Sequence, residues 1–180
     1  MLYTGTGDKG TTNAFGCDQQ KISKSSELPE ALGALDELNA FLGFVKLRAK
    51  DASDDARIAL ALREMQENLF IIQAELAGTE KHLASEAIRK METMIGDIER
   101  EIPPITGFSI AGGTEVSALI DVARTLARRA ERRIIAAKDA KACKILEETL
   151  SYMNRLSSLL FALARLANHL ADTKEEMPRY

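Results

Sequence analysis

Apolar residues recur at steps of three and four along most of the chain, a spacing that places them on one face of an α-helix. The first such stripe covers residues 29–45, and similar stripes cover 54–78, 85–101, 114–137 and 141–171. The pattern therefore predicts about five helices, each of which buries one face.

The segments between the stripes carry residues that end or start helices. Pro103–Pro104 ends the third helix, because proline lacks an amide donor and clashes with the preceding turn. The carboxylates of Asp54–Asp55 suit the start of the second helix, and Thr114 is predicted to cap the fourth. Residues 105–113 are predicted to form a loop.

The N-terminal segment differs from the rest of the chain. Residues 1–27 show no sustained period and hold several glycines among Thr, Ser, Lys and Asp, which predicts an irregular arm. Beyond it, long helices are joined by short links with no strand-like run between them. The predicted fold class is therefore all-α, an up-and-down bundle of about five helices with an irregular N-terminal arm. A length of 180 residues fits a single domain, with the arm at 1–27 and the bundle at 28–171.

Composition and charge argue against several classes of protein. Aromatic residues make up 5% of the chain and Trp is absent, which is unusual for a β-sandwich. The net charge of −3 gives no reason to expect nucleic acid or an anionic membrane as the main partner. The N-terminus has no apolar signal core, and no apolar run reaches the ~20 residues that span a membrane. A cytoplasmic location is therefore predicted.

The cysteines and histidines do not follow the spacing of a metal site. Cys17 and Cys143 lie far apart, and His82 and His169 are the only histidines. This spacing provides neither a disulfide framework nor a ligand set for zinc. No protein-bound metal is predicted.

The sequence RTLARRAERR at residues 124–133 divides its charges between two faces of the fourth helix. The face with the small and branched apolar residues must be the buried one. The stripe that borders this face consists of Arg124, Arg128 and Glu131, with Arg132 at its edge. The remaining arginines, Arg129 and Arg133, point elsewhere and are predicted to be solvated.

Two interpretations of this stripe stay open at the level of sequence. One is an ordinary charged face laced by pairs three or four residues apart, such as Arg128–Glu131. The other is an anion-binding surface, because an arginine beside a core is costly to desolvate unless it meets an anion.

A second candidate for anion binding is the segment TGTGDKGTT at residues 4–12. Glycines let a backbone approach a phosphate closely, threonine hydroxyls and amides donate hydrogen bonds, and Lys9 supplies charge. The segment lacks the spacing of a P-loop, and no strand precedes it. A flexible arm without function explains the same composition.

Three further features have both a structural and a functional interpretation. Asn154 on the last helix can satisfy a neighbouring carbonyl or bind a ligand. Asp36 and Glu37, beside the first stripe, are solvated unless an arginine of another helix or subunit meets them. Phe108, in the loop at 105–113, can be a plain lid over the core.

Taken in order, these segments resemble the ATP:cob(I)alamin adenosyltransferases of the PduO type. The matching segments are YTGTGDKGTT at 3–12, ALGALDELNAFLG at 31–43, GFSIAGGTEVSALIDVARTLARRAERRII at 107–135 and YMNRLSSLLFALAR at 152–165. The second and third helices carry no such signature.

The resemblance implies an enzyme that transfers the 5′-deoxyadenosyl group of ATP to the cobalt of reduced cobalamin and releases triphosphate. It implies ATP with Mg²⁺ as co-substrate, cobalamin as substrate, and a homotrimer with active sites between subunits. A cobalamin reductase and an adenosylcobalamin-dependent enzyme are the further partners that it suggests. A nucleotide-sensing or cobalamin-escorting bundle without turnover is the alternative function.

The resemblance also assigns roles to individual residues. Those matching nucleotide-binding positions are Thr4, Gly5, Thr6, Gly7, Lys9, Thr12, Asn13, Lys24, Arg128, Glu131, Arg132 and Asn154. Arg128 is additionally expected to stabilise charge on the leaving triphosphate. Asp36 and Arg124 match an ion pair that crosses the subunit boundary, and Phe108 matches an aromatic residue that displaces the lower axial ligand of cobalamin.

The chain departs from the family pattern at two places. Ser158 stands where the family often has the aspartate of NRLSD, so no carboxylate is available there. Ser25–Ser26 replace the two aspartates of a KDD motif, which weakens the assignment of Lys24.

Overall fold

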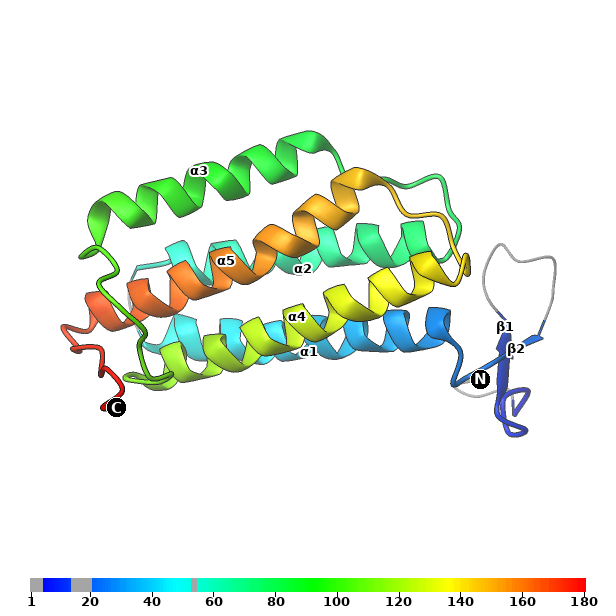
Figure 1. Ribbon diagram of the computed structural model, residues 1–180, viewed down its shortest axis with the longest axis horizontal. Helices are drawn as coiled ribbons and strands as arrows, with labels where there is room; N and C mark the ends of the chain where they lie inside the picture. Colours follow the sequence, from blue (N-terminus) through cyan, green and yellow to red (C-terminus); the bar gives the residue numbers. More distant parts are fainter. Residues whose placement is uncertain (1–4, 14–20, 53–54) are drawn as a thin grey trace.

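A computed structural model of the chain describes residues 5–13, 21–52 and 55–180. These residues form five α-helices and one two-stranded antiparallel sheet. The elements are β1 (Thr11–Asn13), β2 (Lys21–Ser23), α1 (Glu27–Ala52), α2 (Arg57–Leu76), α3 (Ser85–Glu101), α4 (Glu115–Asp139) and α5 (Glu147–Leu170). Each helix runs in the direction opposite to the one before it (Figure 1), which confirms the predicted all-α, up-and-down bundle.

The helix α4 occupies a central place in the bundle. It packs against α1 on one side and α5 on the other, while α2 lies on α1 and α3 lies on α5. The small sheet stands at the end of the bundle where α1 begins and α4 ends (Figure 1). The helix α4 thus connects the two halves of the bundle, the α1–α2 pair and the α3–α5 pair.

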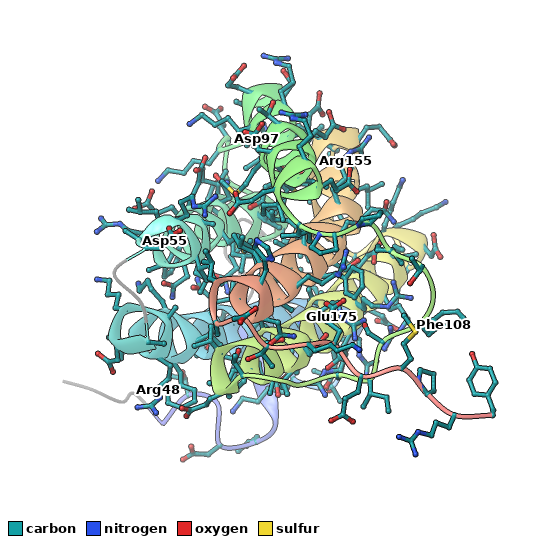
Figure 2. The ribbon with its side chains drawn as sticks, turned by 90° about the vertical axis from the view of Figure 1, so that its left-hand side faces the viewer. Arg48, Asp55, Asp97, Phe108, Arg155 and Glu175 are labelled. Atoms are coloured by element: carbon teal, nitrogen blue, oxygen red, sulfur yellow. The ribbon has the colours of Figure 1, made fainter. Side chains whose placement is uncertain are left out.

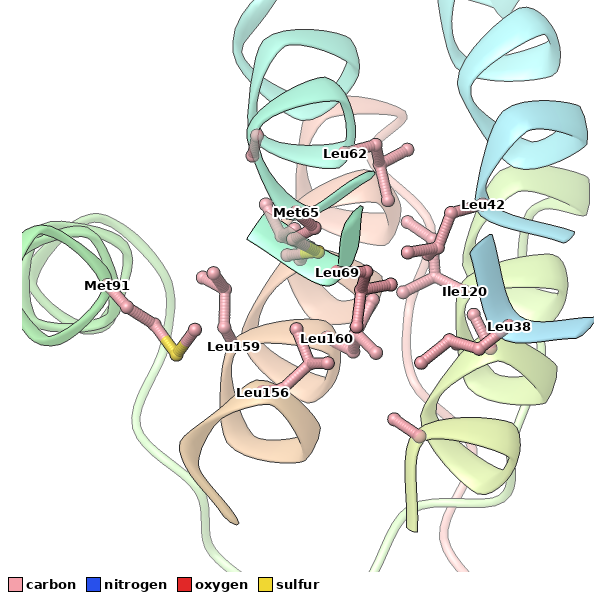
Figure 3. Packing of buried hydrophobic residues seen from close by; sticks show 14 of the residues in the cluster. Leu38, Leu42, Leu62, Met65, Leu69, Met91, Ile120, Leu156, Leu159 and Leu160 are labelled. Carbon is pink, nitrogen blue, oxygen red and sulfur yellow. The ribbon is translucent and has the colours of Figure 1, made fainter. Parts of the chain in front are cut away.

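Leucines and other branched residues from all five helices form one continuous core. Figure 3 shows Leu38 and Leu42 of α1 facing Ile120 of α4, with Leu62 and Leu69 of α2 beside them. On α4 half of the eight buried residues are alanines, and Ala123, Ala127, Ala130 and Ala137 have no exposed surface. These small side chains let α1 and α5 approach the α4 backbone closely. The buried face of α4 is the one that its sequence pattern predicts.

One large polar side chain is accommodated inside this core. Tyr152 of α5 is 1% exposed, and its hydroxyl accepts a hydrogen bond of 3.2 Å from the side-chain amide of Asn68. Burial raises the pKa of the Tyr152 phenol far above its usual range. Its hydroxyl therefore stays neutral and fixes the register between α2 and α5.

The predicted starts of two helices are confirmed in their chemistry. The Thr114 hydroxyl accepts a hydrogen bond of 3.1 Å from the amide of Ser117, so this residue caps α4. Asp55 accepts one of 2.9 Å from the amide of Arg57 at the start of α2, whereas Asp54 lies outside the described residues. The Arg57 guanidinium also lowers the pKa of the Asp55 carboxyl.

The predicted start of the last helix is wrong. A helix was expected from Lys141, but α5 begins at Glu147 and residues 141–146 form a link. Lys141 adopts a φ of 55°, the left-handed conformation that ends a helix. The first turn of α5 is capped from another helix, because Glu75 of α2 accepts hydrogen bonds from the Leu146 amide at 2.8 Å and the Thr149 hydroxyl at 3.0 Å.

The arm is more ordered than its sequence predicts. Thr11, Thr12 and Asn13 of β1 pair with Ser23, Ile22 and Lys21 of β2. The strands are only three residues long, and β1 holds no apolar residue, so no sustained strand pattern was available. Ile22 packs against the core and attaches the hairpin to the bundle.

Glu75 offers a direct test of how the link to α5 is held. Its side chain is 3% exposed, and its loss would leave the partly buried Leu146 amide and the buried Thr149 hydroxyl without acceptors. We expect Glu75→Ala to lower the free energy of unfolding by about 2–3 kcal/mol, measured by urea denaturation. Glu67→Ala, which removes an exposed i,i+4 pair with Arg63, should cost about 0.5 kcal/mol. Equal losses would show that Glu75 is not a cap.

Candidate active site on α4, α5 and the N-terminal arm

The arginines of α4 divide into those that pair within the chain and those that do not. Arg129 forms an ion pair with Glu37 of α1, and Arg133 approaches Glu30 of α1 to 3.5 Å. Both were predicted to be solvated; their side chains are half-exposed, but each has a carboxylate partner. These two arginines therefore belong to the contact between α1 and α4.

Arg128 and Arg132 are exposed and make no hydrogen bond or ion pair with any residue that the structure describes. The Arg128–Glu131 pair of the ordinary-surface interpretation is not formed. The Glu131 carboxylate instead accepts a hydrogen bond of 3.1 Å from Asn154 of α5. Two like charges one helical turn apart repel each other unless an anion lies between them. This geometry favours the anion-binding interpretation.

The contrast with the other arginines strengthens this conclusion. Except for Arg179 in the C-terminal tail, every other arginine of the chain lies within 4.0 Å of a carboxylate. Those paired arginines are Arg48, Arg57, Arg63, Arg89, Arg100, Arg124, Arg129, Arg133, Arg155 and Arg165. The bundle thus neutralises its arginines almost everywhere except at the edge of α4.

A groove of about 330 Å³ runs between α3, α4 and α5 beside these residues. Arg124, Arg128, Ser157 and Ser158 line it together with Phe161 and Arg165. The groove therefore combines three arginines, one carboxylate (Glu99) and hydroxyl groups with an apolar wall, and this predominantly cationic lining suits a ligand with both anionic and apolar parts.

Arg124 and Asp36 do not pair with each other within one chain. The Nε of Arg124 donates to Asp121 at 3.1 Å, one turn earlier on α4. Asp36 is exposed and has no partner among the described residues. The remaining guanidinium donors of Arg124 are not engaged by any described side chain, so they stay available to a carboxylate outside the chain.

The arm brings several of its predicted residues together. Gly5 and Gly10 have φ values of 69° and 76°, and the Gly10 amide donates to the carbonyl of Gly7 at 3.1 Å. A Cβ on Gly7 would lie 2.9 Å from the Nζ of Lys24, so this lysine folds closely over the glycine turn. The turn and the ammonium group thus form one compact unit, although Lys24 is the residue that the sequence assigned least firmly.

The other arm residues occupy exposed or half-exposed positions. Thr12 and Asn13 lie on β1, and Thr6 and Lys9 lie in the turns that precede it. Lys9 makes no hydrogen bond or ion pair with a described residue. Thr4, the first residue of the assigned set, lies outside the described residues.

Phe108 is not a lid over the core. It lies in the loop between α3 and α4 with 79% of its surface exposed, and Ile105 and Ile110 on either side are also more than half exposed. Figure 2 shows Phe108 at the outer edge of the molecule, on the side where Glu175 of the C-terminal tail lies. A large aromatic side chain held away from its own core is suited to contact something outside the chain.

Sequence reasoning did not find Asn168, which shapes the loop just before α4. Its side chain is buried, accepts from the Thr114 amide at 3.0 Å and donates to the Gly112 carbonyl at 2.9 Å. Gly113 has a φ of 108°, and a Cβ there would lie 2.5 Å from the Asn168 oxygen. The pair of glycines before Thr114 was the available signal, since it marks a turn that side chains would block.

The described residues provide neither a cluster of metal ligands nor a helix that could span a membrane. Among the described residues, no three His, Cys, Asp or Glu side chains lie close enough to hold a metal ion. The helices of the described chain also include none with the length and apolar character of a membrane span.

Comparison with known proteins agrees with this geometry. A family model for cobalamin adenosyltransferase matches residues 2–167. The chain is 39% identical over 171 residues to the corrinoid adenosyltransferase PduO of Salmonella typhimurium. It is 37% identical over 171 residues to a corrinoid adenosyltransferase of Bacillus subtilis, covering 93% of this chain and 86% of that protein.

The chain belongs to the cobalamin adenosyltransferase family. It spans 48% of the length of the Salmonella protein and 50% of the PduO of Citrobacter freundii, which is about half of each. Among solved structures, a variant of the PduO-type ATP:corrinoid adenosyltransferase from Lactobacillus reuteri, complexed with cobalamin and ATP, superimposes with a TM-score of 0.89. The two chains are 29% identical and each is covered completely.

The difference between paired and unpaired arginines on α4 leads to a prediction that a binding measurement can test without catalytic turnover. We expect Arg128→Ala to weaken binding of inorganic triphosphate by about tenfold or more, because a charge-assisted bond to phosphate contributes about 1.5–3 kcal/mol. Arg129→Ala, which removes an arginine paired with Glu37, should change the affinity less than about twofold. Isothermal titration calorimetry with circular dichroism as a folding control measures both variants. The same loss of affinity in both would contradict the division.

Proposed function

We propose that the chain transfers the 5′-deoxyadenosyl group of ATP to the cobalt of cob(I)alamin and releases triphosphate. The observation that carries this proposal is that Arg128 and Arg132 of α4 have no carboxylate partner among the described residues, and that Arg128 lines a groove with polar and apolar walls, in a member of this family. The Lactobacillus reuteri neighbour is complexed with cobalamin and ATP, which supports the choice of substrates.

The transfer is a nucleophilic substitution at carbon. The cobalt of cob(I)alamin donates an electron pair to C5′ of ATP, the C5′–O bond breaks, and the bonding electrons leave with triphosphate. Cobalt(I) is itself a strong nucleophile, so the reaction requires no protein general base. What remains for the protein is to orient C5′ and to stabilise the charge that grows on the leaving group.

The assigned cations suit the second task. Arg128 and Arg132 on α4 and Lys9 and Lys24 on the arm have no carboxylate partner among the described residues, so their charge is available to a triphosphate. The glycine turn next to Lys24 offers close backbone approach to phosphate oxygens. Because these cations are already unpaired, binding the triphosphate breaks no internal ion pair.

Several polar groups are available for the rest of the nucleotide. The hydrogen bond between Asn154 and Glu131 holds an amide and a carboxylate side by side across α5 and α4. Thr6, Thr12 and Asn13 supply further hydroxyl and amide groups on the arm. Mg²⁺ that enters with ATP would be held chiefly by phosphate oxygens and water, as is usual for this ion.

The exposed position of Phe108 fits the role of a wedge against cobalamin. Co(II) is easier to reduce once its axial ligands are removed, and an aromatic side chain can displace the lower ligand without replacing it. We propose that Phe108 acts in this way, and that its loss impairs the reaction mainly when Co(II) must first be reduced.

The proposed active site is completed by other copies of the chain. We propose a homotrimer in which Asp36 of one subunit meets Arg124 of the next. Both residues are consistent with this arrangement, because Asp36 has no partner among the described residues and Arg124 engages them only through its Nε. We further propose a cytoplasmic enzyme that works with a cobalamin reductase and supplies an adenosylcobalamin-dependent enzyme.

The activity is tested by incubating the protein with ATP and chemically reduced cobalamin. The absorption spectrum of the alkylated corrinoid should appear, and triphosphate should be released in equal amount. Binding of both substrates without alkylation would identify the chain as an escort or sensor and overturn the proposed activity.

Phe108→Ala should separate reduction from transfer. Starting from Co(II)alamin with a biological reductant, we expect the rate to fall by at least about a hundredfold, equivalent to about 2.7 kcal/mol of barrier. Starting from preformed Co(I)alamin, the loss should be much smaller. The melting temperature should stay unchanged, because the side chain is already 79% exposed. A similar loss of rate from both starting states would show that Phe108 does not act by displacing the lower ligand.

Asp36→Asn should weaken assembly of the trimer. Removal of one partner from a buried ion pair costs about 3–5 kcal/mol, because the other charge is left without compensation. The measurement is the molar mass by light scattering across a dilution series, and Glu37→Gln on the same helix is the matched control. A wild-type monomer at all concentrations would contradict the proposed assembly.

A further inference from the structure

The C-terminal tail after α5 folds back onto the loop that carries Phe108. The side chain of Arg165 joins the two segments: its Nε donates to the Glu175 carboxylate at 2.9 and 3.1 Å, and its Nη2 donates to the Pro103 carbonyl at 3.0 Å. The Arg165 side chain is 10% exposed and the Glu175 side chain 27% exposed, so the ion pair between them is partly shielded from water. Its contribution is therefore larger than that of a surface ion pair.

A second contact connects the tail with the loop on the other side of Phe108. The Ile110 amide donates to the Glu176 carbonyl at 2.8 Å, and it is the only amide of residues 103–113 with a backbone partner among the described residues. Phe108 thus lies between two attachment points: the Ile110 amide is bonded to the tail directly, and the Pro103 carbonyl is connected to it through Arg165 of α5. The stretch between them has no regular secondary structure to hold it.

We infer that Arg165 and Glu175 form a strap that positions Phe108, so that the tail is a working part of the site. The inference rests on the proposed function and adds a positioning role for residues beyond 167, where the family match ends. An exposed aromatic side chain on an irregular loop gains burial only after its ligand arrives, so its direction must be set by the backbone on either side. The strap provides this constraint while leaving the side chain itself uncovered.

The role of Arg165 differs from that of its neighbours in the groove. Arg165 lines the groove with Arg124 and Arg128, but its guanidinium is engaged by Glu175 and Pro103. It is therefore a positioning residue and not a ligand for the triphosphate. A substitution of Arg165 would also alter the groove, so the test instead substitutes its partner in the tail, Glu175.

The test compares Glu175→Ala with the matched control Glu176→Ala in the full chain. Both remove one carboxylate from adjacent tail positions, but the described structure shows no bond from the Glu176 side chain, only one to its carbonyl. Hydrogen exchange of the Ile110 amide should rise about tenfold or more in Glu175→Ala and stay near the wild-type rate in Glu176→Ala. Glu175→Gln, which keeps an acceptor without the charge, should fall between them.

The activity readout separates positioning from simple destabilisation. In Glu175→Ala the rate from Co(II)alamin should fall several times more than the rate from Co(I)alamin, with unchanged ATP affinity, which is the pattern expected for Phe108→Ala. Unchanged exchange at Ile110, or equal effects of the two alanine variants, would overturn the inference. A wild-type protein without turnover would overturn the proposed function instead, and the exchange comparison would still decide whether the strap holds the loop.

Discussion

The close packing of α4 between α1 and α5 is the constraint on which the rest of the structure depends. Fully buried alanines on α4 allow both neighbours to approach its backbone, so one helix takes part in both halves of the bundle. A helix enclosed in this way has little surface left for charges. Its arginines must therefore emerge along its edges, where they either meet carboxylates of α1 or face the groove beside α5.

Whether an arginine of α4 forms an ion pair depends on the edge of the helix on which it lies. Arg129 and Arg133 emerge toward α1 and meet Glu37 and Glu30, so they stabilise the bundle. Arg128 and Arg132 form no ion pair with any carboxylate of the described residues. The nearby Glu131 instead accepts a hydrogen bond from Asn154. Exposed, unpaired cations contribute nothing to folding at this position. In the proposed function their partner is the triphosphate of ATP, which has the complementary charge.

In the loop before α4, several contacts hold the backbone in place while the side chain of Phe108 stays exposed. Asn168 fixes its end at Gly112–Thr114, and Arg165 with the tail fixes its beginning and middle. Phe108 is left exposed between these attachments. A backbone that is restrained while its aromatic side chain stays uncovered loses little entropy when a flat ligand docks against it.

The sequence by itself determined the number of helices, the buried face of α4 and the Thr114 cap, because these depend on residues within one or two turns of each other. It also singled out Arg128, Glu131, Lys24 and Phe108, through local pattern and family resemblance. Only the tertiary structure decided which arginines are paired, that Lys24 covers the glycine turn, that Phe108 is exposed, and that α5 starts at Glu147 under a cap from Glu75. The physical reason is that charge pairing, capping between helices and burial depend on partners from distant parts of the chain, and local periodicity carries no information about them.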